Sequence, residues 1–87
     1  MTLDDLHFEG LELFPPDALP ADEFIARLRA GMLVASGDRL LRDWNYAPWF
    51  SGSFTHAGQS VDVTVYLGGL GKLTSGSACT HFLLATP

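Results

Sequence analysis

Charge is scarce in the second half of this 87-residue chain. From Trp44 to Pro87 the only charged side chains are Asp62 and Lys72. Sheets in soluble proteins usually carry charge, above all Lys on edge strands, which discourages pairing with other chains. Because residues 44–87 have almost none of that protection, we expect part of their surface to lie against another chain.

Lysine and arginine are missing from the first 26 residues, which carry a run of carboxylates instead. The net charge of the whole chain is −5. Proteins that bind nucleic acid normally show a basic stripe, so this charge balance argues against a nucleic-acid partner. The acidic stretch is either a solvated face or a docking patch for a basic partner. Its carboxylates are Asp4, Asp5, Glu9, Glu12, Asp17, Asp22 and Glu23.

Disulfides and membrane spans are also missing. Cys79 is the only cysteine, which excludes an internal disulfide and favours a reducing compartment. The chain starts with acidic residues where a secretory signal would be basic, and no run approaches the roughly 18 apolar residues of a membrane helix. We therefore expect a cytoplasmic protein with no membrane partner.

The composition predicts one compact domain over residues 1–87. Hydrophobic residues make up 47% of the chain and charged residues 17%, against about 25% charged in typical domains. The chain is therefore expected to be globular, with a single small core.

The first half predicts one strand and one helix. Residues 6–14 alternate imperfectly, and Gly10 stands where the phase slips, which suggests a bulge. Two prolines end that strand, and Pro20 lies near the start of a helix with an apolar stripe. The helix ends at Gly31 or at Gly37. The periodicity runs to Ala35 and favours Gly37; the alternative ends the helix near residue 30 and makes residues 32–35 a short strand.

The second half predicts strands at residues 39–46, 49–56, 60–67 and 78–85, with turns at 57–59 and 68–71. The predicted fold is therefore α+β: an antiparallel sheet of four to five strands with one helix packed on one face, in the order β-α-β-β-β-β. The cleanest strand is 60–67. Its predicted core face is Val61, Val63, Val65 and Leu67, packed on Ile25, Leu28 and Met32.

Motifs with chemical meaning are weak. The segment Gly68–Lys72 resembles a phosphate-binding loop, but Leu73 stands where Ser or Thr is needed and the chain continues as strand, so we interpret it as a hairpin connection. Cys79 and His81 share one face of a strand, and with His56 and His7 they could form a metal or Cys-His site. The simpler interpretation is a small buried thiol beside a surface histidine. No catalytic residue, cofactor or metal is predicted, and an enzyme is not expected.

The densest aromatic cluster runs from Trp44 to Phe50 and contains both tryptophans. It is either a core anchor formed by Trp44 and Phe50, with Trp49 at the rim, or a protein-binding hot spot, because Trp and Tyr are enriched in such spots.

We therefore expect a small acidic protein-binding module, of inhibitor or immunity type or a phage or bacterial accessory protein, that covers a basic surface of its partner. The alternatives are a structural homo-oligomer, such as a homodimer, and a minimal Cys/His enzyme or metal protein. The predicted contact residues are Asp4, Asp5, Glu9, Glu12, Tyr46 and Trp49.

Overall fold

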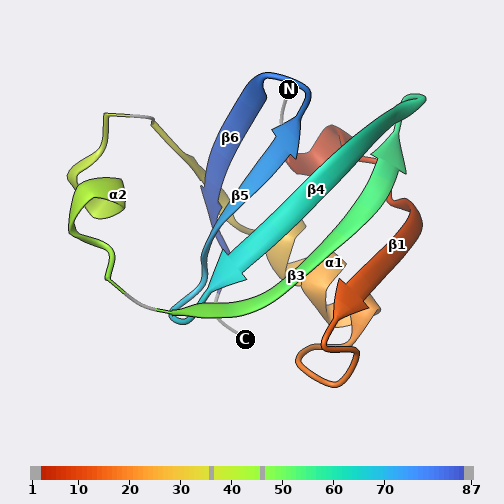
Figure 1. Cartoon of the computed structure of the whole chain (residues 1–87), viewed down its shortest axis with the longest axis horizontal. Coiled ribbons are helices and arrows are strands. Elements are labelled where there is room, and N and C mark those ends of the chain that lie inside the picture. The colour runs from red at the N-terminus through yellow and green to blue at the C-terminus, as the bar shows by residue number, and fades with distance from the viewer. Residues whose placement is uncertain (1–2, 36, 46, 86–87) are drawn as a thin grey trace.

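A computed structural model of the chain describes residues 3–35, 37–45 and 47–85 (Figure 1). Its elements follow in the order η1 (Leu3–Asp5), β1 (Glu9–Phe14), α1 (Ala21–Arg29), β2 (Met32–Val34), α2 (Arg39–Asp43), β3 (Pro48–His56), β4 (Gln59–Tyr66), β5 (Leu70–Ser75) and β6 (Ala78–Leu83). The radius of gyration is 12.1 Å, close to the roughly 12 Å of a compact domain of this length. Neither helix in the described part of the chain is long and apolar enough to cross a membrane.

The six strands form one antiparallel sheet in the order β1-β3-β4-β5-β6-β2. The α+β class is confirmed, whereas the predicted count of four to five strands and one helix is too low. Both edges come from the first half of the chain, since β1 and β2 flank the strands formed after Trp44. The nearly uncharged segment therefore forms the interior of the sheet, where each strand is already paired on both sides.

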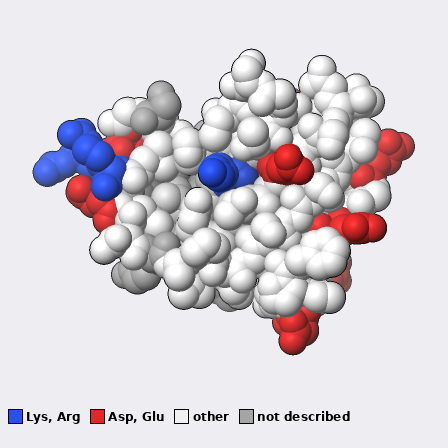
Figure 2. All heavy atoms as spheres, in the orientation of Figure 1, with Lys and Arg blue, Asp and Glu red and all other residues white. Residues whose placement is uncertain are grey.

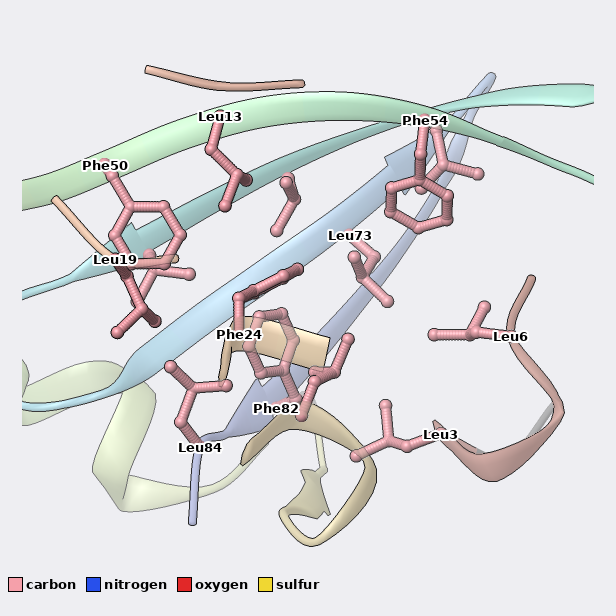
Figure 3. Packing of buried hydrophobic residues seen from close by; sticks show 14 residues of the cluster. Leu3, Leu6, Leu13, Leu19, Phe24, Phe50, Phe54, Leu73, Phe82 and Leu84 are labelled. Carbon is pink, nitrogen blue, oxygen red and sulfur yellow. The ribbon is translucent and has the colours of Figure 1, made fainter. Parts of the chain in front are cut away.

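The core lies between the sheet and α1, which packs behind it (Figure 1). We call the side of the sheet that faces α1 the inner face and the opposite side the outer face. Phe24 and Leu28 of α1 are fully buried, and Phe24 makes an edge contact with Phe50 at 5.6 Å between ring centroids. Figure 3 shows Phe24 and Phe82 meeting at the centre of this core. The buried cluster is Leu3, Leu6, Leu13, Leu19, Phe24, Leu28, Phe50, Phe54, Val61, Val63, Val65, Leu73, Phe82 and Leu84.

The bulge predicted in the first strand is confirmed. Gly10 has a φ of +64°, a conformation that glycine adopts without steric cost. The pairing of β1 with β3 shifts register between Glu9 and Glu12. The strand then ends at Phe14, immediately before the two prolines, as expected from their missing N–H groups.

The preferred end of the helix at Gly37 is wrong, and the alternative is confirmed. Helix α1 ends at Arg29, and Met32–Val34 form β2 in regular register with β6. A Cβ at Gly31 would overlap the Leu83 carbonyl oxygen, so only glycine lets the chain pass from helix to strand here. Pairing with β6 outweighs the weak helical periodicity, because propensity alone contributes little.

Two further predictions need correction. Residues 39–46 do not form a strand: residues 39–43 form the helix α2, which Asp38 precedes at a position where Asp favours a helix start. The segment 68–71 is not all turn either. The turn centres on Gly68 and Gly69, which have φ values of +98° and +104°, and β5 begins at Leu70. The sequence pattern did not indicate β5, because its two leucines, Leu70 and Leu73, are three residues apart and so lie on opposite faces of the strand.

The strand β4 has the predicted core face except at its end. Val61, Val63 and Val65 are buried, but Leu67 lies beyond the strand and is 45% exposed. On the helix side, Leu28 is buried and Ile25 packs against the cluster, whereas Met32 is 60% exposed on β2 and does not join it.

Truncating Val63 should therefore destabilise the fold. Val63 is 1% exposed, and removing two buried methyl groups from a packed core costs about 1–3 kcal/mol of unfolding free energy. The matched control is Leu67→Ala, where an exposed side chain is shortened and a change within about 0.5 kcal/mol is expected. Urea denaturation measures both. Equal losses for the two variants would contradict the assigned core face.

Candidate functional site

The outer face of β3 and β4 carries mostly small hydroxyl side chains, and Thr74 of β5 continues them. Direct cross-strand partners share a face, and on this side the register places Ser51, Ser53, Thr55, Ser60, Thr64 and Thr74. The charged residues on β3 to β6 are Asp62 and Lys72, and both belong to this face. Figure 2 shows the result: a broad surface with little charge, seen from the side opposite α1. Such a surface can lie flat against another protein without burying many charges.

One end of the outer face is covered by the chain between β2 and β3. In Figure 1 this segment, with α2 in it, stands out to the left of the sheet. The Trp44 ring lies against Gly68, where a Cβ would come within 2.7 Å of the indole, and Leu70, which lines the same pocket as Trp44, is only 4% exposed. Trp44 thus packs on the outer face and not in the main core, contrary to one of the two interpretations of the aromatic cluster.

The opposite edge of the sheet is acidic. Glu9 and Glu12 on β1 are exposed and pair in register with Thr55 and Ser53, and no described cation forms an ion pair with either. Phe14 continues the same face and is 57% exposed. We call Glu9, Glu12 and Phe14 the acidic edge. In Figure 2 several carboxylates lie on the right, where Figure 1 places β1, whereas basic groups and carboxylates lie together at the left, over α2.

Sequence reasoning missed Phe14 as a surface residue. The signal was present, because Leu11 and Leu13 occupy the phase opposite to Glu12 and Phe14. Leu13 is 9% exposed on the inner face, so the alternation directs Phe14 to the outer face. A large apolar side chain beside two carboxylates is a contact of the kind that protein interfaces bury.

The remaining predicted contacts are dispersed. Asp5 is exposed in η1. Asp4 also lies in η1, but its side chain is outside the described part, and so is the whole of Tyr46. Trp49, the second residue of β3, lies six residues before Thr55, the register partner of Glu9, which corresponds to about 20 Å along an extended strand. The structure therefore groups Glu9 with Glu12, and it does not group Trp49 with them.

The indole of Trp49 serves the packing between the sheet and α1. Its ring makes an edge contact with Phe50 at 4.9 Å, and the guanidinium carbon of Arg27 stands 5.9 Å from its centroid. Arg27 Nε donates a hydrogen bond of 2.8 Å to the Ala85 carbonyl oxygen. Trp49 is half-buried by these contacts, so it tethers α1 and the end of the chain to the start of β3.

The cysteine and histidines do not converge on one site. Cys79 and His81 lie on the outer face of β6, whereas His56 lies on the inner face of β3, with β4 and β5 between the two strands. His56 instead pairs with His7: the rings stack at 5.6 Å, and the His7 backbone N–H donates to His56 Nδ1 at 3.0 Å. Among the described residues, no group of three or more His, Cys, Asp or Glu is placed to hold a metal ion.

No family model, curated protein or solved structure matches the chain. A function for it has to come from the chemistry of its own surface.

Cys79 is exposed, so the expectation of a buried thiol is wrong. The native protein should react with a thiol reagent to one equivalent, at a rate within about threefold of the urea-unfolded chain, because access does not require opening of the fold. Absorbance of the released thiolate of Ellman's reagent measures both rates. Protection of the native thiol by orders of magnitude would contradict the exposed position.

Proposed function

We propose that this protein acts by binding another protein through its acidic edge and the adjoining outer face of β3 and β4. The partner presents a basic surface, which the protein covers as an inhibitor or accessory protein does, and the encounter takes place in the cytoplasm. The observation that carries the proposal is the acidic edge itself, where two exposed carboxylates and an exposed Phe stand beside a sheet face whose charged residues on β3 to β6 are Asp62 and Lys72 alone.

Charge distribution supports a basic partner. The carboxylates along an edge strand repel one another. They also raise the association rate with a protein that presents a basic surface. Phe14 and the hydroxyl-lined strands beside it then provide area for contact, where the partner can bury the Phe14 ring and form hydrogen bonds with the hydroxyl groups. The bulge and the carboxylates also discourage pairing of β1 with a second copy of itself, which leaves the edge available to a different protein.

Charge reversal at the acidic edge tests the proposal. The variant Glu9→Lys/Glu12→Lys should lose the partner that wild-type protein captures from its source cell, with affinity falling about tenfold or more once the partner is purified. Isothermal titration at low and moderate salt provides the affinities. Wild-type binding should weaken as salt rises, because screening shortens the reach of the carboxylates.

The matched control is Glu23→Lys/Asp43→Lys, which changes the net charge by the same amount at two exposed positions on α1 and α2. It should bind as wild type does, within about twofold. Equal losses in both variants would show that only net charge matters, and unchanged binding of the Glu9→Lys/Glu12→Lys variant would overturn the assignment of the edge.

A homodimer is the second candidate, and the β2 edge favours it. Met32–Val34 carry no charge, proline or bulge, and Met32 and Leu33 are 60% and 46% exposed. Two copies of this strand can pair antiparallel across a two-fold axis. The two acidic edges would then lie at the far ends of the joined sheet, each about five strand spacings, or roughly 24 Å, from the new pairing.

This dimer should tighten as salt rises, because screening removes the repulsion between two molecules of net charge −5. Leu33→Lys should abolish it, and Phe14→Lys on the other edge strand should not. Sedimentation velocity across a concentration and salt series measures the association. A wild-type protein that stays monomeric throughout would exclude the homodimer, without bearing on the proposal that the protein binds a different protein.

A further inference from the structure

A mostly apolar cavity of about 160 Å³ opens on the inner face of the sheet. Its lining residues are Leu6, His56, Gln59, Val61, Leu73, Ser75, Ala78 and Thr80. They come from the strand ends next to the two hairpin turns, β3–β4 and β5–β6, and from the segment after η1. None of the lining residues belongs to the acidic edge, so the cavity is separate from the proposed protein-binding surface.

The cavity exists because α1 covers the other end of the sheet. Arg27 of α1 reaches Trp49 at the start of β3 and the carbonyl oxygen of Ala85 beyond the end of β6. At the hairpin end the inner face is covered from the N-terminal segment by Leu6, which lies apart from α1 in Figure 3. Leu6 and Phe8, whose ring packs on Phe54 at 4.8 Å between centroids, cover this end of the inner face less completely than a helix does, and the cavity lies beside them.

The polar groups of the lining have defined hydrogen-bonding roles. His56 Nδ1 accepts a hydrogen bond from the His7 backbone N–H, so Nε2 is the ring nitrogen that can donate. Ser75 Oγ donates to the Ser60 carbonyl oxygen at 3.2 Å and keeps its own lone pairs free to accept. No Asp, Glu, Lys or Arg is among the lining residues.

We infer that this cavity is a binding site for a small uncharged aromatic molecule of the phenol class. A cavity of about 150 Å³ lined by aliphatic and aromatic side chains holds a benzene ring. Leu6, Val61 and Leu73 supply such a lining. The lining also presents donors and acceptors on the side chains of His56, Gln59, Ser75 and Thr80, and a hydroxyl group on the ring can both donate to and accept from such groups. A charged ring is excluded, because its charge would be buried without a partner.

Titration of the ¹⁵N-labelled protein with phenol tests the site. Saturable shifts are expected at the amides of Val61, Leu73 and Thr80, with a dissociation constant in the millimolar range. Benzoate should bind about tenfold more weakly or not at all. Benzene should compete with phenol for the same site in the wild-type protein, a measurement that needs no variant.

A second test of the site fills the cavity from its rim by substitution. Ala78→Leu places an isobutyl group among the lining residues and should weaken phenol binding by about tenfold or more. Cys79→Leu makes a comparable change on the next residue, which faces the outer side, and should bind phenol as wild type does. Shifts that do not saturate, shifts centred on the outer face, or equal binding of phenol and benzoate would overturn the site, as would unchanged binding by a folded Ala78→Leu variant.

Discussion

Replacing Phe82 by Ala should cost about 3–5 kcal/mol of unfolding free energy, the range for removing an aromatic ring from a packed core. Phe82 is fully buried on β6 and pairs in register with Gly71 on β5 and Leu33 on β2. A domain of this size has a total stability of about 4–13 kcal/mol. The variant is therefore expected to be largely unfolded at moderate urea concentrations at which the wild type remains native.

Leu83→Ala is the control, since Leu83 is the next residue of β6 and is only half-buried on the outer face. It should cost about 1 kcal/mol. Urea denaturation followed by tryptophan fluorescence measures both variants. Similar losses for Phe82→Ala and Leu83→Ala would show that the inner face is not the side that holds the core.

Substitution of Gly71 tests the packing of the Phe82 ring independently. A Cβ at Gly71 would overlap the Phe82 ring, so Gly71→Ala should destabilise the fold by about 1–3 kcal/mol. In a Phe82→Leu background the ring is absent, and the cost of Gly71→Ala should fall by about 1 kcal/mol or more. Additive losses would mean that the ring and Gly71 do not share this space.

Replacing Gly52 by Ala is the second change with a large expected effect. A Cβ at Gly52 would overlap the Glu12 carbonyl oxygen and approach Leu13 Cδ2 to 2.8 Å. The carbonyl belongs to the backbone of β1, which cannot move without breaking the pairing with β3. We expect a loss of about 2–3 kcal/mol and faster amide exchange in β1 than in β4 to β6.

The control for Gly52 is Gly37→Ala. Nothing lies within 4 Å of a Cβ at Gly37, so the change in stability should stay within about 0.5 kcal/mol. Because the acidic edge depends on β1, Gly52→Ala should also weaken partner binding more than its global stability predicts. A Gly52→Ala protein with wild-type exchange rates in β1 would contradict the close pairing of β1 with β3.

The sequence by itself determined the local features whose causes are local. The bulge at Gly10, the end of β1 before the prolines and the inward face of Val61, Val63 and Val65 all follow from the backbone freedom of glycine, the missing N–H of proline and the two-residue period of a strand. The concentration of carboxylates in the first 26 residues was equally plain. It indicated the acidic edge through Glu9 and Glu12, although Phe14 was overlooked.

Tertiary structure decided the features that depend on contacts between residues far apart in the sequence. Residues 32–34 can follow a helical or an extended pattern, and pairing with β6 together with the close approach at Gly31 selects the strand. Lys72–Ser75 have too few apolar residues to indicate a strand until β4 and β6 lie on either side of them. Strand order also placed the nearly uncharged strands inside the sheet, left β1 and β2 as its edges and separated His56 from Cys79 and His81. Strand order and the closeness of distant segments arise from packing across the whole chain, and no local pattern of residues encodes them.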